Sequence, residues 1–190
     1  RYMLAQRLAD AVINGMDPVD LYPVLRAEGR LPHGAPGEYA FRDLLAGVRT
    51  FARAVESARK GTRLPPLDIR LEIAGCTITG RIDRVYPGGI VRHRYAGVRA
   101  GDRLGAWVEY CAAACAAGPG LRPVARLIGR EKDVTVIYDM NDAGMCASHL
   151  ASLVEIFRVG RVSLVPFFPE SSLVFARDYA RNRSVEDALQ

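Results

Sequence analysis

The N-terminal third of the chain has the spacing of helices. Apolar residues recur at helical intervals over residues 3–13, and Asn14-Gly15 supplies a stop signal. Asp17-Pro18 pairs an N-cap residue with a first-turn proline, which predicts a second short helix ending near Gly29. Residues 31–37 are rich in turn formers and predict an irregular connection. A long helix is expected next, from apolar residues at i, i+3, i+4 and i+7: Phe41, Leu44, Leu45, Val48, Ala52 and Val55.

In the middle of the chain the period of the pattern changes to two. Apolar and charged residues alternate from Leu67 to Ile73, as in a half-buried strand, and Ala74-Gly75 forms a turn. Cys76 to Tyr86 is rich in β-formers, and Ile90 to Tyr95 follows after the Pro87-Gly88-Gly89 turn. We therefore expect a three-stranded antiparallel meander.

The C-terminal half returns to helices separated by short strands. Asp102 is expected to cap a helix that closes at Gly118, with an apolar stripe of Leu104, Trp107, Val108, Cys111 and Cys115. Strands near Pro123 to Ile128 and Val134 to Tyr138 precede a helix with apolar residues at 150, 153, 154 and 157. Residues 165–169 form an apolar loop, and a last helix is expected over Ser171 to Arg183.

Length and composition predict one folded domain. The chain has 190 residues, 49% hydrophobic and 25% charged, which excludes disorder and a fibrous repeat. Its longest uncharged apolar stretches are far shorter than the ~18 residues that a membrane span requires. We expect one domain over 1–190, with a helical lead-in and linker (1–36), a core (37–170) and a C-terminal helix (171–190). Because residue 1 is Arg, we expect the chain to be an excised piece of a longer protein.

Cysteine usage indicates a reducing compartment, so we expect the cytoplasm as the location. Four cysteines are too few and too unevenly spaced for a disulfide scaffold, and no signal-peptide pattern precedes the first helix. An iron–sulfur cluster or zinc site is the alternative use of four cysteines. Cys111 and Cys115, however, lie on the apolar stripe of one helix, where free thiols behave as small hydrophobes. His33, His93 and His149 show no metal-ligand spacing, so we expect structural histidines, no metal and no cofactor.

Positive charge is concentrated in one stretch. The formal net charge is +5, from 26 basic and 21 acidic residues. Between Gly80 and Arg103 only Asp83 and Asp102 oppose six arginines, which we call the arginine strip: Arg81, Arg84, Arg92, Arg94, Arg99 and Arg103. Guanidinium groups bind phosphate oxygens in bidentate fashion, so the strip favours nucleic-acid binding. A solvated sheet face without a ligand explains the same charges equally well.

The order of helix, three strands, helix, strand and helix is typical of restriction-endonuclease-like nucleases. In that PD-(D/E)xK-type fold one strand carries a carboxylate, and the neighbouring strand carries a second carboxylate two residues before a lysine. Residues two apart share a strand face, so both point at the metal. Asp83 fits the first position, whereas Arg92 and Arg94 occupy the other two. Because arginine has no lone pair for a metal, this strand predicts a nuclease scaffold without nuclease chemistry.

Two alternatives to this interpretation stay open. Arg92 and Arg94 are also compatible with solvent-facing strand positions, with Asp83 as their surface partner. An active metal-dependent nuclease would need carboxylates from elsewhere, for example Asp83 with Glu72 or Glu109.

Several segments, in this order, carry a resemblance to a known family: Leu31 to Glu38, Gly80 to Val85, Val91 to Tyr95, Asp102 to Leu104 with Trp107, and Pro166 to Ser172. Together they resemble the C-terminal domain of the RecC family, the gamma subunits of exodeoxyribonuclease V. The likeness covers almost all of the 190 residues.

The resemblance implies a degenerate nuclease domain of α+β class, with a mixed sheet flanked by helices, at the end of a long non-catalytic subunit. Such a subunit lies between a helicase–nuclease subunit and a second helicase subunit, separates the strands of broken DNA and serves recombinational repair. Its partners hydrolyse ATP, and no Gly-rich loop ending in Gly-Lys-Ser/Thr occurs in this sequence. Glu38 is compatible with a remnant of the carboxylate that such nucleases carry on a helix, or with ordinary first-turn electrostatics.

The Pro166-Phe167-Phe168-Pro169 segment has two interpretations. Both rings are buried in the core, which is the usual fate of paired aromatics in a short domain, or they anchor another subunit. A subunit contact requires both rings to be exposed in the isolated chain, and burial is the expected outcome.

Overall fold

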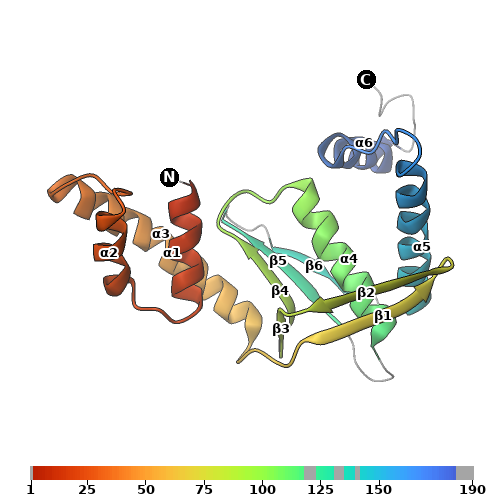
Figure 1. Cartoon of the computed structure of the whole chain (residues 1–190), viewed down its shortest axis with the longest axis horizontal. Coiled ribbons are helices and arrows are strands. Elements are labelled where there is room, and N and C mark those ends of the chain that lie inside the picture. Colours follow the sequence, from red (N-terminus) through yellow and green to blue (C-terminus); the bar gives the residue numbers. More distant parts are fainter. Residues whose placement is uncertain (1, 118–122, 131–134, 140–141, 183–190) are drawn as a thin grey trace. The chain divides into compact units, whose positions relative to one another are not determined.

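The computed structural model describes residues 2–117, 123–130, 135–139 and 142–182 of the chain (Figure 1). It is a mixed α+β protein. Its elements, in chain order, are α1 (Tyr2–Ile13), α2 (Pro18–Ala27), α3 (Ala35–Arg59), β1 (Leu67–Ile73), β2 (Cys76–Ile82), β3 (Val85–Tyr86), β4 (Gly89–Arg94), α4 (Ala100–Ala116), β5 (Ala125–Gly129), β6 (Thr135–Tyr138), α5 (Ala143–Gly160) and α6 (Pro169–Asn182).

Contacts divide the chain into two compact units, each made of three segments. The first unit comprises residues 1–64, 84–98 and 126–136. The second unit comprises residues 65–83, 99–125 and 137–190. The chain therefore passes from one unit to the other several times.

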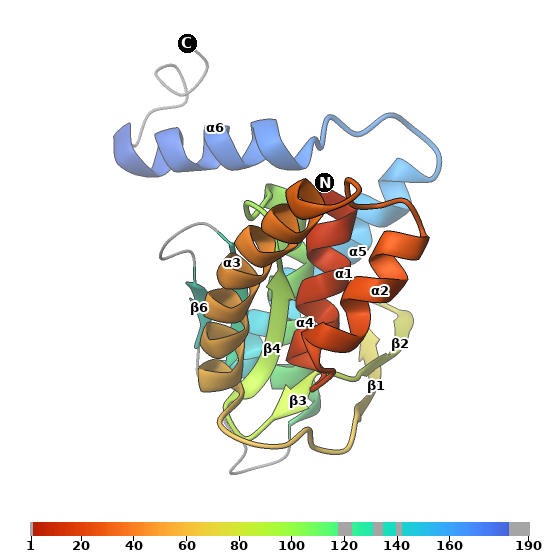
Figure 2. The same ribbon diagram turned by 90° about the vertical axis from the view of Figure 1, so that its left-hand side faces the viewer.

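The first unit packs helices against strand β4. Figure 2 shows α1 beside α3, with α2 next to both. Its core is apolar, and the most deeply buried side chains are those of Leu8, Leu25, Val48, Val55 and Val91. Full burial of one such side chain stabilises the fold by about 1.5–3 kcal/mol. α3 therefore contributes its apolar face to the core and leaves its charged face to solvent.

Local signals explain where these helices begin and how closely they pack. The Asp17 carboxylate accepts a hydrogen bond from the Val19 amide at 2.9 Å, and Pro18 opens α2 as expected for a first-turn residue. Gly47 on α3 has no side chain where the Tyr95 hydroxyl lies, 2.6 Å from the position that a Cβ would take. A glycine at this point allows the aromatic ring to approach the helix.

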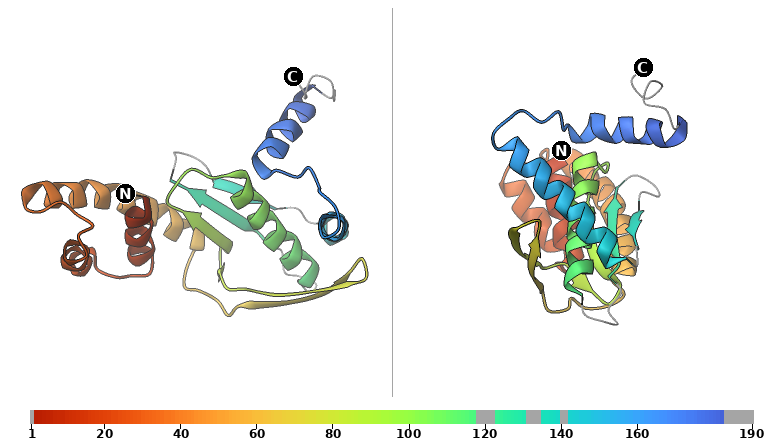
Figure 3. Two further views of the ribbon diagram at one scale, coloured as in Figure 1. Left: turned by 45° about the horizontal axis from the view of Figure 1, so that its top comes forward. Right: turned by 90° about the vertical axis from the view of Figure 1, so that its right-hand side faces the viewer.

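The second unit is built on the β1–β2 hairpin and helices α4, α5 and α6. The hairpin pairs Leu67 with Ile82 at its open end and Ile73 with Cys76 beside the turn. Figure 3 shows the hairpin running along α4, and β1 contacts both α4 and α5. Alternate residues of β1 are buried or half-buried, as expected for one apolar face.

The predicted three-stranded meander is wrong as a single sheet, although both of its antiparallel pairings, β1 with β2 and β3 with β4, are present. β2 pairs with β1 in a two-stranded sheet, and β4 lies between β3 and β5 in a separate sheet ordered β3-β4-β5-β6. The predicted strand from Cys76 to Tyr86 breaks at the exposed pair Asp83-Arg84. The Val85 carbonyl then accepts a hydrogen bond from the Leu64 amide at 2.8 Å, so the segment before β1 takes the place beside β3.

Most of the other predicted elements are confirmed, with small shifts at their ends. α4 begins at Ala100, two residues before the predicted cap, and Asp102 lies in its first turn, where its carboxylate accepts the Arg99 amide at 2.9 Å. The predicted helix stop at Gly118, the strand start at Val134 and the helix end at Arg183 lie outside the described residues. None of the helices in the described ranges has both the length and the apolar character needed to cross a bilayer.

Candidate functional site

Asp83 lies just beyond the open end of the β1–β2 hairpin, in the second unit. Its carboxylate oxygen is 3.3 Å from Arg81 Nε, and Arg81 is also 3.9 Å from Asp68 across the hairpin. Arg81 and Asp83 are two residues apart, whereas Ile82 between them is buried. All three charged side chains are more than half exposed, and ion pairs of this kind contribute at most about 1 kcal/mol.

Arg92 and Arg94 lie on β4, in the first unit. Val91 on this strand and Tyr95 directly after it are buried, and the His93 ring between them packs against Phe51 of α3. Side chains alternate along a strand, so Arg92 and Arg94 occupy the face opposite to Val91 and His93. Both arginines are half-buried.

The sequence predicts that these three groups lie on neighbouring strands. Asp83 follows β2, whose partner is β1, whereas the two arginines belong to β4, whose partners are β3 and β5. Val85, two residues after Asp83, pairs with Ile90 of β4, and the Arg84 carbonyl accepts the Val91 amide at 3.0 Å. The adjacency of Asp83 to the two arginines stays a prediction.

The register of the hairpin also excludes one carboxylate pair. Glu72 lies opposite Thr77, near the turn, and its carboxylate accepts the Thr77 hydroxyl at 2.8 Å. Thr77 and Ile82 are five residues apart on β2, which is about 17 Å at the usual strand rise. Glu72 and Asp83 are thus too far apart to share a metal ion. Glu109, the other candidate, lies on α4.

The arginine strip is divided between the two units. Arg84, Arg92 and Arg94 belong to the first unit, and Arg81, Arg99 and Arg103 to the second. Arg99 precedes α4, and the Arg103 carbonyl accepts the Tyr138 hydroxyl at 3.0 Å.

His93 makes contacts that the sequence does not reveal. Its Nε2 is 3.1 Å from the Asp10 carboxylate of α1, and its side chain is 11% exposed. Burial lowers the pKa of His93, against the opposing hydrogen bond and charge of Asp10. Tyr95, directly after the strand, also contacts α1, because its amide donates a hydrogen bond to Gln6 Oε1 at 2.8 Å. His93 is structural in this arrangement, as the sequence predicts.

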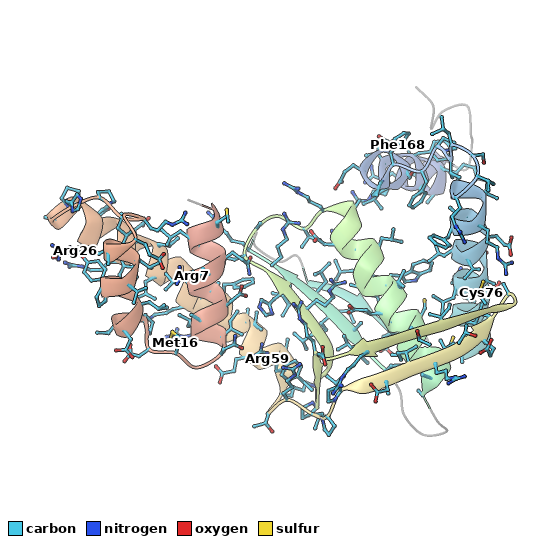
Figure 4. All side chains as sticks on the ribbon, in the orientation of Figure 1. Arg7, Met16, Arg26, Arg59, Cys76 and Phe168 are labelled. Carbon is cyan, nitrogen blue, oxygen red and sulfur yellow. The ribbon has the colours of Figure 1, made fainter. Side chains whose placement is uncertain are left out.

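The thiols are mainly core residues. Cys111 and Cys146 are fully buried, and Cys115 is partly buried. Burial, followed by the neighbouring Cys146, raises the pKa of Cys111 to about 12. Cys76 lies at the start of β2 (Figure 4), where Arg158 contacts its sulfur at 3.1 Å. Within the described part of the chain, no group of three or more His, Cys, Asp or Glu side chains is arranged to hold a metal ion.

The expected burial of Phe167 and Phe168 is wrong. Phe167 is 40% and Phe168 66% exposed, and Figure 4 shows Phe168 beside α6. Phe167 borders an apolar cavity of about 260 Å³ in the second unit, together with Trp107, Tyr138 and Leu173. Pro169 opens α6, so both rings lie in the connection that precedes this helix, and both are exposed there.

Known proteins show similarity over nearly the whole chain. Residues 1–180 match the family model described as the RecC C-terminal domain. A curated relative, the RecBCD enzyme subunit RecC of Escherichia coli (strain K12), is 28% identical over 171 residues, which cover 90% of this chain. The chain spans 15% of the length of that relative. Because the family model covers most of its residues, the chain belongs to the RecC C-terminal domain family.

Proposed function

We propose that this chain is a non-catalytic, nuclease-like domain of an exodeoxyribonuclease V gamma subunit. It handles DNA strands and holds subunits together in a cytoplasmic helicase–nuclease complex that repairs double-strand breaks by recombination. The fold we propose is a degenerate restriction-endonuclease-like one. One observation carries the proposal: the chain belongs to the RecC C-terminal domain family, and its strand β4 carries Arg92 and Arg94. We take β4 as the counterpart of the nuclease strand that bears a carboxylate and a lysine.

The chemistry of guanidinium supports strand handling without cleavage. A guanidinium group stays protonated, donates hydrogen bonds only and has no lone pair to offer a cation. The same group binds phosphate oxygens through two parallel hydrogen bonds. Arg92 and Arg94 would therefore hold a DNA backbone where an active relative would hold a metal ion. We assign nucleic-acid contacts to the whole arginine strip on the same grounds.

The surface of the second unit supports a role in assembly. Several large apolar side chains between α5 and α6 lie in solvent: Val162 at 87% exposure, Leu164 at 101%, and Phe168 at 66%. Exposed apolar clusters of this kind mark protein interfaces. We assign Phe167 and Phe168 to the contact with a partner subunit, either the helicase–nuclease subunit or the second helicase subunit. The relative named as a subunit of the RecBCD enzyme is consistent with this role.

A nuclease and binding assay on the purified chain tests the proposal. With Mg²⁺ or Mn²⁺ we expect no cleavage of single-stranded or duplex DNA, and we expect salt-sensitive binding. Replacing Arg92 and Arg94 by Ala should weaken binding and reduce the slope of log K against log salt by about 0.7–0.9 per lost phosphate contact. Cleavage that disappears in Asp83→Ala would overturn the non-catalytic assignment and establish the metal-dependent alternative.

A further inference from the structure

The first unit contains a basic hollow that lies outside the arginine strip. It has a volume of about 630 Å³ and lies between the end of α1, the C-terminal half of α3 and the loop that follows α3. Its charged lining is contributed by α3, as Arg49, Arg53, Glu56 and Arg59. The lining thus carries three positive charges and one negative charge, so the net charge of the hollow is positive. We call it the α3 hollow.

Two of these arginines are kept side by side. Arg49 and Arg53 are four residues apart, so they lie on one face of the helix about one turn apart. Like charges at this spacing repel each other and destabilise a helix. Both are exposed, and neither makes a hydrogen bond or ion pair with another described residue. An anion in the hollow would offset this repulsion.

The third arginine is fixed in position. Arg59 Nη1 donates to the Ile13 carbonyl at the end of α1 at 3.1 Å, and the guanidinium lies 4.6 Å from the centre of the Tyr86 ring. Figure 4 shows Arg59 near the end of α3. A guanidinium held by a carbonyl and an aromatic face loses little further freedom when it binds an anion. The α3 hollow is therefore built around an oriented cation.

The loop after α3 adds backbone and hydroxyl groups. Gly61 and Thr62 line the hollow, and Gly61 has a φ of +142°, which other residues rarely adopt. A Cβ at Gly61 would also approach Pro87 to 3.3 Å. A glycine here brings the main chain to the edge of the hollow, where amide and hydroxyl groups are typical partners of phosphate oxygens.

We propose that the α3 hollow binds the sugar-phosphate backbone of a DNA strand through Arg49, Arg53 and Arg59. The proposal rests on the strand-handling function above and adds a second contact to it. From residue 49 to residue 59 the helix rises about 15 Å, so the three cations form a row. A row of this length fits successive phosphates of a strand better than one small anion, for which a single cluster suffices.

The test measures DNA affinity of the complete 190-residue chain with a fluorescent oligothymidylate, by anisotropy across a salt series. We expect the double variant R49A/R53A to bind at least about 5-fold more weakly at 0.1 M salt, with the salt slope reduced by about 1 to 1.5. R49K/R53K should restore most of the affinity, because lysine also neutralises phosphate. Alanine favours helix and both positions are exposed, so the fold should persist, which circular dichroism verifies.

The matched control removes the same charge elsewhere on the first unit. Arg26 at the end of α2 and the nearby Arg30 are exposed, and Figure 4 shows Arg26 on α2. R26A/R30A should stay within about 2-fold of the unmodified chain. Equal affinities for R49A/R53A and R26A/R30A would reduce the effect to net charge and overturn the α3 hollow as a site.

Two further comparisons distinguish a failure of the α3 hollow from a failure of the proposed strand-handling function. If R92A/R94A weakens binding and R49A/R53A does not, the α3 hollow is overturned and the strand-handling function stands. If the unmodified chain binds no DNA at any salt concentration, both fall together. Calorimetry with inorganic phosphate forms the last arm: saturable binding that R49A/R53A abolishes, with DNA affinity unchanged in that variant, would make the hollow a small-anion site and overturn the proposal.

Discussion

At the scale of single residues, His93 shows how burial and charge act on one group. Its ring is packed against Phe51, which lowers its pKa, while Asp10 acts in the opposite direction and Arg84 and Arg59 add to the lowering. The neutral ring is therefore favoured in the folded chain. As the pH falls, His93 of the unfolded chain binds a proton near the ordinary histidine pKa of ~6.5, whereas His93 of the folded chain binds it only at a lower pH. The stabilisation that comes from the neutral His93 ring is therefore complete above pH ~6.5 and is lost as the pH falls from there through the lowered pKa of the folded chain.

We accordingly expect the unfolding free energy of the unmodified chain to fall more between pH 7.5 and 5 than that of His93→Gln. The extra loss is at most about 1.4 kcal/mol per pH unit over this window. Urea unfolding at a series of pH values measures it. His33→Gln, at an exposed position in the connection before α3, serves as the control and should retain the pH profile of the unmodified chain. Parallel profiles for His93→Gln and the unmodified chain would contradict the assignment.

The same residue shows what the sequence can and cannot predict. The alternation along residues 90–95 predicts that His93 lies opposite Arg92 and Arg94, and the spacing of the histidines argues against a metal site. Its partner Asp10, however, is 83 residues away in sequence, and local pattern carries no information on such a contact. The α3 hollow was missed for a related reason: Arg49 and Arg53 look like an ordinary solvated helix face until the end of α1 is placed beside them.

At the scale of elements, the turn between β1 and β2 limits the stability of the hairpin. Ala74 and Gly75 both have positive φ, 50° and 67°, which two-residue type I′ turns require. Glycine adopts this conformation freely, whereas alanine is strained there. Asparagine is the residue most favoured before glycine in such turns. Ala74→Asn should therefore stabilise the chain by about 0.5–1 kcal/mol, measured by urea unfolding.

The control for this change places the same residue in a helix. Ala54 lies on the exposed side of α3, where asparagine has a lower helix propensity than alanine. Ala54→Asn should destabilise the chain by about 0.5 kcal/mol. A gain of stability in Ala54→Asn, or a loss in Ala74→Asn, would show that backbone strain at Ala74 does not limit the stability of the chain.

Elements whose signals are local could be predicted from the sequence. Helical spacing with an Asp17 cap gave α2, and strict alternation gave β1 over Leu67–Ile73. Pairing between strands could not be predicted in the same way. One partner of β4, β3, lies directly before it in the chain, but the other is β5, some thirty residues further along. The intervening α4 hides this second pairing from any short window of sequence. The expected single sheet failed at this step, because β2 and β4 belong to different sheets.

At the scale of the whole molecule, the core of the first unit depends on residues from later segments of the chain. The core of the first unit joins helix residues before position 64 with four residues that come later: Tyr86, Val91, Tyr95 and Ile128. All four are 8% exposed or less. At about 1.5–3 kcal/mol for each buried side chain, their contribution of roughly 6–12 kcal/mol matches the entire stability of a typical domain.

A fragment of residues 1–64 should therefore lose cooperative folding although it contains α1, α2 and α3 intact. We expect a helical circular dichroism spectrum of reduced amplitude, a gradual thermal transition in place of a sigmoidal one, and binding of a hydrophobic dye to the uncovered face of α3. The complete chain, under the same conditions, should unfold cooperatively and leave the dye unbound. A sigmoidal transition of the fragment at a similar temperature would show that the three helices form a sufficient core alone, and that β4 and β5 add recognition surface and not stability.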